Sequence, residues 1–190
     1  PYSPPSNGSN SNPGSGEVEI YQKNTDDKWE YMHSIYSNSR GNLGKGLSLS
    51  SDGSILAIGT PGENLVGRVY LYKRNSNNVW EDPNTILDGN EWSTFNGDYY
   101  FDRFGTSIAL SGDGNTLIIG AIEIEHSMRD EDNDASGYAR IFTNTNNNWT
   151  QIGGDINGDN IGDFLGYSVD ISSDGSIIAT GAPGNDSLGD

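Results

Sequence analysis

The chain has 190 residues and no cysteine, and its 27 acidic against 10 basic residues give a net charge of -17 at pH 7. Nucleic acids and anionic membranes bind proteins through clustered Lys and Arg side chains, so this charge argues against both as partners. No apolar run approaches the roughly 20 residues of a membrane-spanning helix. The length is enough for one domain with its own core.

Residues 1–16 (PYSPPSNGSNSNPGSG) contain almost no apolar side chains. A segment rich in Pro, Ser, Asn and Gly predicts a flexible or polyproline-like linker. We expect such a linker to tether the domain that follows, or to join it to another segment.

A repeated hairpin pattern follows the linker. Three segments align without a gap: Leu43–Pro61, Asp102–Ile122 and Asp163–Pro183. Each contains an Asp-Gly turn, and the turns lie 61 residues apart, at Asp52, Asp113 and Asp174. Alternating apolar and polar residues precede each turn and an apolar run follows it, which predicts a β-hairpin.

A second hairpin pattern alternates with the first. A glycine is followed five residues later by an aromatic residue, then by an Asn-rich turn and a tryptophan. The aromatic positions are Tyr21, Tyr72 and Phe142, and the tryptophans are Trp29, Trp80 and Trp149. This predicts a third and a fourth strand for each unit, with the tryptophans in the core between neighbouring units.

Combined, the two patterns predict an all-β protein built from four-stranded antiparallel units. Residues 43–88 and 104–153 contain complete units, whereas 17–36 hold only strands three and four, and 165–190 only strands one and two. Tandem units of this kind are blades of a β-propeller. A propeller needs at least about four blades, so we expect a partial propeller, completed by sequence outside this chain or by another chain. In the second case the half blades of two chains join, in a closed dimer of about six blades or an open head-to-tail array.

The glycine-containing motifs of these units resemble the FG-GAP repeat of integrin α-subunit propellers. The pairs are Phe104-Gly105 with Gly120-Ala121, and Leu165-Gly166 with Gly181-Ala182-Pro183. The longer pattern from Trp149 onward resembles tandem FG-GAP-type repeats of microbial and algal surface or secreted proteins. The resemblance covers about residues 17–190. The first copy departs most from it, with Leu43-Gly44 and Gly59-Thr60-Pro61.

The resemblance implies calcium binding in the first hairpin, through a loop of the form Asp-x-Asp-x-Asp-Gly-x-x-Asp. Here each hairpin turn keeps only one carboxylate, that of Asp52, Asp113 or Asp174. One carboxylate does not supply the six to eight oxygens that calcium takes. We therefore expect these aspartates to bond their own backbone in the turn.

Two other acidic segments are candidate calcium sites. Oxygen-bearing side chains are spaced as in a calcium loop at Asp155, Asn157, Asp159 and Asp163. A second cluster contains Asp130, Asp132 and Asp134. The simpler alternative for either segment is a solvated acidic loop, since Asp, Gly and Asn are common in such turns. No other cofactor is indicated.

Catalysis has little support in the sequence. The histidines are His33, in an expected outer strand, and His126, in a variable loop, and there is no cysteine nucleophile. Acid–base or nucleophilic catalysis needs such groups beside a positioned partner. We expect the chain not to be an enzyme.

An aromatic insertion and three glycosylation sequons are candidate surface features. The insertion at 88–101 holds Trp92, Phe95, Tyr99 and Tyr100. These side chains predict either a contact surface for a glycan or protein, or a small cluster packed over the blade edge. The sequons begin at Asn7, Asn148 and Asn185, and they matter only in a secreted protein.

The function that these observations favour is a non-catalytic β-propeller at an extracellular or particle surface, acting as an interaction or structural module through its variable loops. One alternative is a carbohydrate-binding or carbohydrate-active propeller. Another is a subunit of an assembled surface filament, appendage or capsid. The expected locations are therefore secreted, cell wall, appendage or virion.

Overall fold

The computed structural model describes residues 14–37, 40–83, 85–89, 94–95, 98–122, 124–126 and 136–186, with backbone only for 94–95, 98–101 and 124–126. Within these residues the fold is all-β, with several antiparallel sheets and no α-helix, which confirms the predicted class. A 3-10 turn, η1 (Glu63–Leu65), follows one strand. No helix in the described ranges is long and apolar enough to span a membrane.

Two complete sheets form the middle of the molecule. The first has the order β3-β4-β5-β6, comprising β3 (Leu47–Leu49), β4 (Ile55–Thr60), β5 (Arg68–Lys73) and β6 (Thr85–Asp88). The second has the order β9-β10-β12-β13, comprising β9 (Phe104–Leu110), β10 (Thr116–Ala121), β12 (Tyr138–Thr145) and β13 (Asn148–Gln151). A further strand, β14 (Ile156–Asn157), also pairs with β12. The second sheet thus reaches beyond residue 153, where we expected its unit to end.

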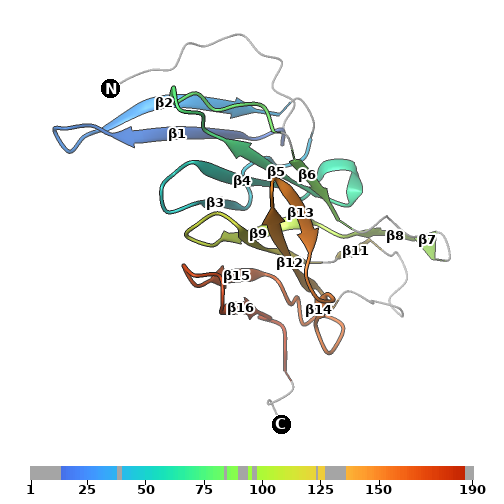
Figure 1. Cartoon of the computed structure of the whole chain (residues 1–190). Coiled ribbons are helices and arrows are strands. Elements are labelled where there is room, and N and C mark those ends of the chain that lie inside the picture. The colour runs from blue at the N-terminus through green and yellow to red at the C-terminus, as the bar shows by residue number, and fades with distance from the viewer. Residues whose placement is uncertain are drawn as a thin grey trace.

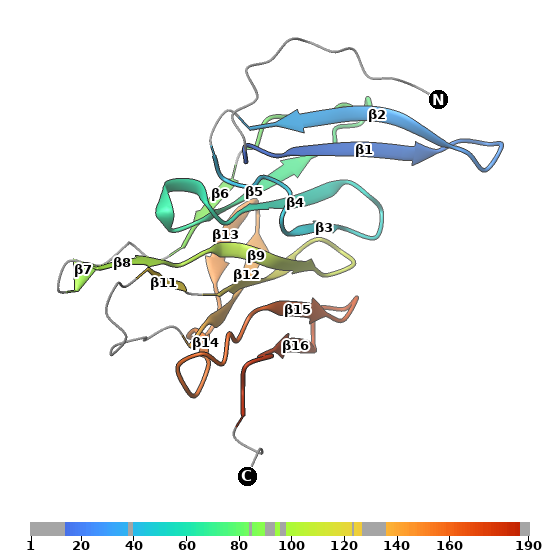
Figure 2. The ribbon, with the colours of Figure 1, turned by 180° about the vertical axis from the view of Figure 1, so that it is seen from behind.

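A two-stranded hairpin lies at each end of these sheets. One pairs β1 (Glu17–Lys23) with β2 (Trp29–Tyr36), and the other pairs β15 (Ser168–Ile171) with β16 (Ile178–Gly181). Figures 1 and 2 show the four sheets stacked in chain order, with the β1–β2 hairpin at one end and β15–β16 at the other.

The outer strand of both complete sheets is interrupted, although the sequence pattern predicts one strand. In the first sheet Trp80 forms a single bridge to Arg74 before β6 begins. In the second sheet β13 ends before Gly153, whose φ of 71° leaves the extended region, and β14 resumes the pairing. Pro83 lies in the first interruption and has no N–H to donate to a ladder.

The Asp-Gly turns have the predicted hairpin structure. Asp113 Oδ1 accepts the Asn115 backbone N–H at 3.0 Å and the Ser111 hydroxyl at 2.6 Å. Asp52 and Asp174 accept the corresponding bonds in their own turns. The expectation that these aspartates bond their own backbone is confirmed. Hydrogen bonds from the Ser50 hydroxyl, and then from the backbone and hydroxyl of Ser54, lower the pKa of Asp52 to about 2. The corresponding bonds from Ser172 and Ser176 lower the pKa of Asp174 to about 2.

Consecutive sheets pack face to face through three apolar clusters. Between the first hairpin and the first complete sheet lie Val18, Ile20, Ile35, Leu43, Leu56, Ile58 and Trp80. The largest cluster, between the two complete sheets, contains Ala57, Val69, Leu71, Phe104, Ile108, Leu110, Leu117, Ile119, Ala121, Tyr138 and Phe142. The third joins Ala109, Ile118 and Ala139 to Val169, Ile171 and Ile178. Apolar residues on both faces of a sheet are therefore explained by a neighbour on each side.

The tryptophans differ among the units. Trp80 is buried and Trp149 packs against the central cluster, as expected, but Trp29 is mostly exposed. The prediction of a core position is wrong for Trp29. Trp80 and Trp149 each pack where an earlier sheet adjoins their own, and within the described residues no sheet precedes that of Trp29.

Backbone hydrogen bonds join the sheets at equivalent positions. The Ser51 N–H donates to Gly112 O at 2.9 Å, and the Gly112 N–H donates to Ser173 O at 2.8 Å. At the other end of the first strands, the N–H groups of Leu43, Phe104 and Leu165 donate to Ser15, Val66 and Ser136 O. The repeated unit therefore includes the contact to its neighbour as well as its own strands.

A small sheet lies beside the stack. Its order is β11-β8-β7, formed by β7 (Thr94–Phe95), β8 (Asp98–Phe101) and β11 (Ile124–His126). Figures 1 and 2 both show it projecting to one side. The aromatic insertion thus pairs with the segment that follows β10, so the two longest variable segments are joined.

Candidate functional site

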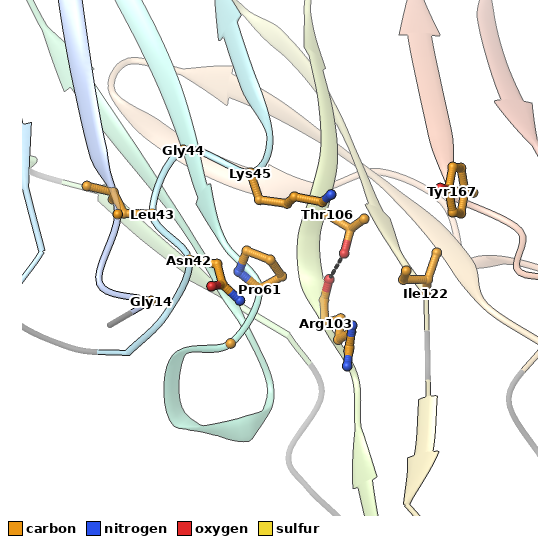
Figure 3. Close-up of a pocket in the computed structure, with 12 residues that line it drawn as sticks. Gly14, Asn42, Leu43, Gly44, Lys45, Pro61, Arg103, Thr106, Ile122 and Tyr167 are labelled. Carbon is orange, nitrogen blue, oxygen red and sulfur yellow. Dashed lines mark hydrogen bonds between the residues drawn. The ribbon is translucent and has the colours of Figure 1, made fainter. Parts of the chain in front are cut away.

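A cleft of about 1160 Å³ opens at one end of the first strands and is the candidate binding site. Figure 3 shows its lining side chains on separate elements, with Lys45 extending toward Thr106 and with Tyr167 on the far side. The lining residues are Gly14, Gly16, Asn42, Leu43, Gly44, Lys45, Pro61, Gly62, Arg103, Thr106, Ile122 and Tyr167.

Equivalent positions of successive units form this cleft. Asn42 and Arg103 precede the first strands of the two complete sheets and share a left-handed backbone, with φ of 56° and 51°. Such values are uncommon for residues other than glycine and accompany tight turns. Thr106 stabilises its turn by donating from Oγ1 to Arg103 O at 2.8 Å. Lys45 and Thr106 lie three residues after Asn42 and Arg103, at equivalent positions of their units. Because each unit turns in the same way, both side chains line the cleft.

The charge of the cleft is opposite to that of the whole chain. Lys45 and Arg103 are both exposed, and the described residues that line the cleft include no carboxylate. The chain as a whole carries a net charge of -17. Two cations separated by apolar and hydroxyl groups suit a ligand with an anionic group, since Arg and Lys form charge-assisted hydrogen bonds with carboxylates and sulfates.

A buried ionic network lies elsewhere, between β12 and the segment before β14. Arg140 donates to both oxygens of Asp155, at 2.8 and 2.6 Å. Its guanidinium lies 5.0 Å from the ring centroid of Tyr138, whose hydroxyl donates to Asp102 at 2.7 Å. The hydrogen bonds from Arg140 lower the pKa of Asp155, and the same contact raises the pKa of Arg140. The Arg140–Asp155 pair therefore holds the segment that leads into β14 against β12.

The candidate calcium residues at 155–163 are engaged in other contacts. Asp155 is bound by Arg140, and Asn157 belongs to β14. The buried Asp163 accepts the backbone N–H groups of Asp159 and Asn160 and the side-chain amide of Asn185. Within the described ranges no group of three or more His, Asp or Glu residues is arranged to hold a metal. Calcium binding by this segment stays a prediction.

Several other predicted residues fall outside the described part of the chain. Asp130, Asp132, Asp134, Trp92 and Asn7 are among them. For Phe95, Tyr99 and Tyr100 the structure gives only the backbone, in β7 and β8. Their roles as metal ligands, partner surface or glycosylation site remain predictions.

The remaining predicted positions are placed by the structure. Asn148 begins β13 and is exposed, as is Asn185, which donates to Asp163 at 3.0 Å. His33 is exposed on β2, and His126 ends β11. The structure thus leaves the Asn148 side chain accessible, whereas the amide of Asn185 is already used in a loop contact.

Comparison with protein-family models finds no match, and comparison with curated proteins finds no relative. The cleft was not predicted from the sequence, because Lys45 and Arg103 are separated by 57 intervening residues and belong to no chemical motif. Their near-equivalent places in the aligned repeat are the signal that could have found them.

Proposed function

We propose that this chain is a non-catalytic β-propeller module at an extracellular or particle surface, and that it binds an anionic group of a partner in the cleft between Lys45 and Arg103. The observation that carries the proposal is the repeated packing of four-stranded antiparallel sheets, each joined to the next by equivalent hydrogen bonds. Stacked sheets of this kind are the units of propellers, which present variable loops around their ends. The resemblance to FG-GAP repeats supports the same assignment and the surface location.

The cleft supports the recognition role. It lies at the loop end of the first strands. Its lining residues flank or belong to strands of consecutive sheets, from Gly16 before β1 to Tyr167 before β15. A rigid sheet scaffold with binding residues on its loops is a common arrangement in recognition proteins. Acidic glycans suit the cleft, because they present carboxylates or sulfates beside hydroxyl and apolar faces.

The test is binding of an acidic and a neutral oligosaccharide, chondroitin sulfate tetrasaccharide and chitotetraose, measured by calorimetry. We expect the acidic probe alone to bind, and the Lys45→Gln/Arg103→Gln variant to weaken its binding by about tenfold or more, equivalent to roughly 1.4 kcal/mol. Lys28→Gln, which removes an exposed cation in the turn between β1 and β2, away from the lining residues of the cleft, is the control. An equal loss in both variants, or no binding of the acidic probe, would contradict the proposed site.

The aromatic insertion defines the lectin alternative. Trp92→Ala/Tyr99→Ala tests it with the same probes. If the wild type binds the neutral probe, if this variant loses that binding and if Lys45→Gln/Arg103→Gln keeps it, recognition belongs to the insertion and not to the cleft.

A second candidate function, a subunit of an assembled surface structure, is favoured by a different observation. Within the described residues, β1 and β16 each pair on one side only, and they lie at opposite ends of the stack (Figures 1 and 2). Unpaired strand edges are templates for pairing with another chain.

A further inference from the structure

We infer that β16 of one copy of this chain pairs with β1 of a second copy, so that the two terminal hairpins form one four-stranded sheet. The inference deepens the proposed propeller arrangement and rests on it, because it extends the same sheet and the same packing to a neighbouring molecule. The occupant is a second copy because this chain carries both halves of one four-stranded unit, β15–β16 as its first two strands and β1–β2 as its last two.

The strand edges match those inside the complete sheets. β4 pairs with β3 and β5, and β10 pairs with β9 and β12. Within the described residues β16, the equivalent of β4 and β10, pairs only with β15. β1 holds the place of β5 and β12, since each follows the glycine that begins a third strand, Gly16, Gly67 or Gly137.

The complete sheets also define the register of the new pair. In the first, Ile55 lies opposite Lys73 and Gly59 opposite Val69. In the second, Thr116 lies opposite Thr143 and Gly120 opposite Ala139. Transferred to the equivalent positions, this pattern places Ile177 opposite Gln22, Thr180 opposite Glu19 and Gly181 opposite Val18. Exposed strand edges are commonly protected by charged residues, but β16 contains none.

Exposed apolar residues on β3 indicate a missing neighbour on one side of this contact. Leu47 and Leu49 are 47% and 52% exposed, whereas their equivalents Ile108 and Leu110 in β9 are 8% and 7% exposed. Ile108 and Leu110 are covered by the preceding sheet. The same cover for Leu47 and Leu49 would come from the β15–β16 hairpin of another copy.

The β15–β16 hairpin carries the complementary surface. Ile177 is 70% exposed, while its equivalent Ile55 packs against the cluster that contains Ile108 and Leu110. Ala179 is exposed, while its equivalent Ala57 is fully buried in that cluster. In the joined sheet Ile177 and Ala179 of one copy cover Leu47 and Leu49 of the next.

Trp29 gives independent support from the opposite face of β2. It is 70% exposed, against 7% for the equivalent Trp80. In the joined sheet this face packs on the sheet that precedes β15, which is the complete β9–β13 sheet of the neighbouring copy. Trp29 is thus exposed in the single chain and buried in the inferred assembly.

The backbone links between Asp-Gly turns extend across the same contact. Ser51 donates to Gly112 and Gly112 to Ser173. The next link joins the Ser173 N–H of one copy to Ser51 O of the second. Each copy supplies two complete sheets and shares a joined sheet with each neighbour, so two copies that close on each other form a ring of six sheets, and copies that do not close form an open array.

The first test is the mass in solution, by light scattering after size exclusion. A monomer has 20.5 kDa, and we expect at least twice this mass. The charge of -17 on each copy opposes association. Salt screens this repulsion, so we expect more assembly at 0.5 M NaCl than at 0.05 M NaCl. A monomer at both salt concentrations, with the circular dichroism of a folded β-protein, overturns the inference. The proposed function then still stands, because it is judged by ligand binding.

The second test is a disulfide in the inferred register. The chain has no cysteine, so Glu19→Cys/Thr180→Cys introduces the only two. Because β1 and β16 lie at opposite ends of the molecule (Figures 1 and 2), any disulfide between them joins two copies. We expect rapid crosslinking under mild oxidation, and slower crosslinking for the off-register control Gln22→Cys/Thr180→Cys. Equal rates overturn the register.

The third test breaks the apolar contact. Leu49→Lys and Ile177→Lys place a charge in the inferred interface, and both are expected to shift the mass to that of a monomer. Val79→Lys changes an apolar side chain that is 55% exposed in a turn away from the interface, and it should leave the mass unchanged. If Leu49→Lys and Ile177→Lys keep the wild-type mass, these faces do not meet and the inference fails.

Discussion

The carbonyl oxygen of Gly105 lies directly over Gly59, so that a methyl group at Gly59 would come 2.0 Å from it. Gly59 belongs to β4 and Gly105 to β9, in consecutive sheets. The same approach recurs one unit later, where a methyl group at Gly120 would lie 2.0 Å from Gly166 O. Glycine is therefore required at positions 59 and 120 because the second strand of one sheet comes this close to the backbone of the next unit.

We expect Gly59→Ala to destabilise the protein by about 3 kcal/mol, because backbone has to move apart to admit the methyl group. The measurement is the urea unfolding midpoint followed by tryptophan fluorescence. Gly154→Ala is the control, since no atom lies within 4 Å of its added methyl group. A loss of stability of the same size in both variants would show that the close approach is not the cause.

The Arg140–Asp155 pair predicts a loss of stability in acid. Arg140 lowers the pKa of Asp155 in the folded protein, so the pair's contribution is complete above the unfolded pKa of roughly 4 and decreases as the pH falls through the folded pKa. Breaking a fully buried pair costs roughly 3–5 kcal/mol, and the partial exposure of Asp155 reduces our expectation for Asp155→Asn to about 2 kcal/mol at pH 7.

The measurement is the urea midpoint of wild type and Asp155→Asn at pH 7, 4 and 3. We expect the difference between them to shrink as the pH falls, because acid removes from the wild type the charge that the variant already lacks. Asp26→Asn, in an exposed turn, serves as the control with little effect at any pH. A difference that stays constant from pH 7 to pH 3 would contradict a role for the ionised carboxylate.

The strand content of the fold was predictable, because period-two alternation and Asp-Gly turns are local signals. The interruptions of the outer strand were less so, since Trp80 and Trp149 continue the pattern up to the break. The exposure of Trp29 was not predictable from a local pattern, because burial depends on which sheet lies opposite. For the same reason the spacing of Asp155 and Asp163 suggested a calcium loop, whereas Arg140, a residue distant in sequence, binds the first of them.

The turn hydroxyls predict a graded effect on stability. Ser111 Oγ donates to Asp113 and accepts the Thr116 N–H at 2.9 Å, and Ser111 is fully buried. We expect Ser111→Ala to destabilise the protein by about 2 kcal/mol, because the Thr116 N–H loses its acceptor at a buried position. Ser172→Ala removes the same bonds in the more exposed C-terminal turn and should cost less. Thermal unfolding of both variants checks the order, and a larger loss in Ser172→Ala would contradict it.

Calcium dependence is expected to follow the acidic segment at 130–134 and not the segment at 155–163. In the second segment Asp155 is held by Arg140, and Asp163 accepts three hydrogen bonds. Calcium would have to displace these partners to gather six to eight oxygens. A ligand that binds only the native state raises the melting temperature. The variant Asp130→Asn/Asp132→Asn/Asp134→Asn lacks the expected calcium ligands. We therefore expect neither 1 mM calcium nor EDTA to change its melting temperature by more than about 1 °C. Asp159→Asn is the matched variant in the other segment and should behave as wild type. A calcium-dependent shift that persists in the triple variant and disappears in Asp159→Asn would instead assign the metal to the segment at 155–163.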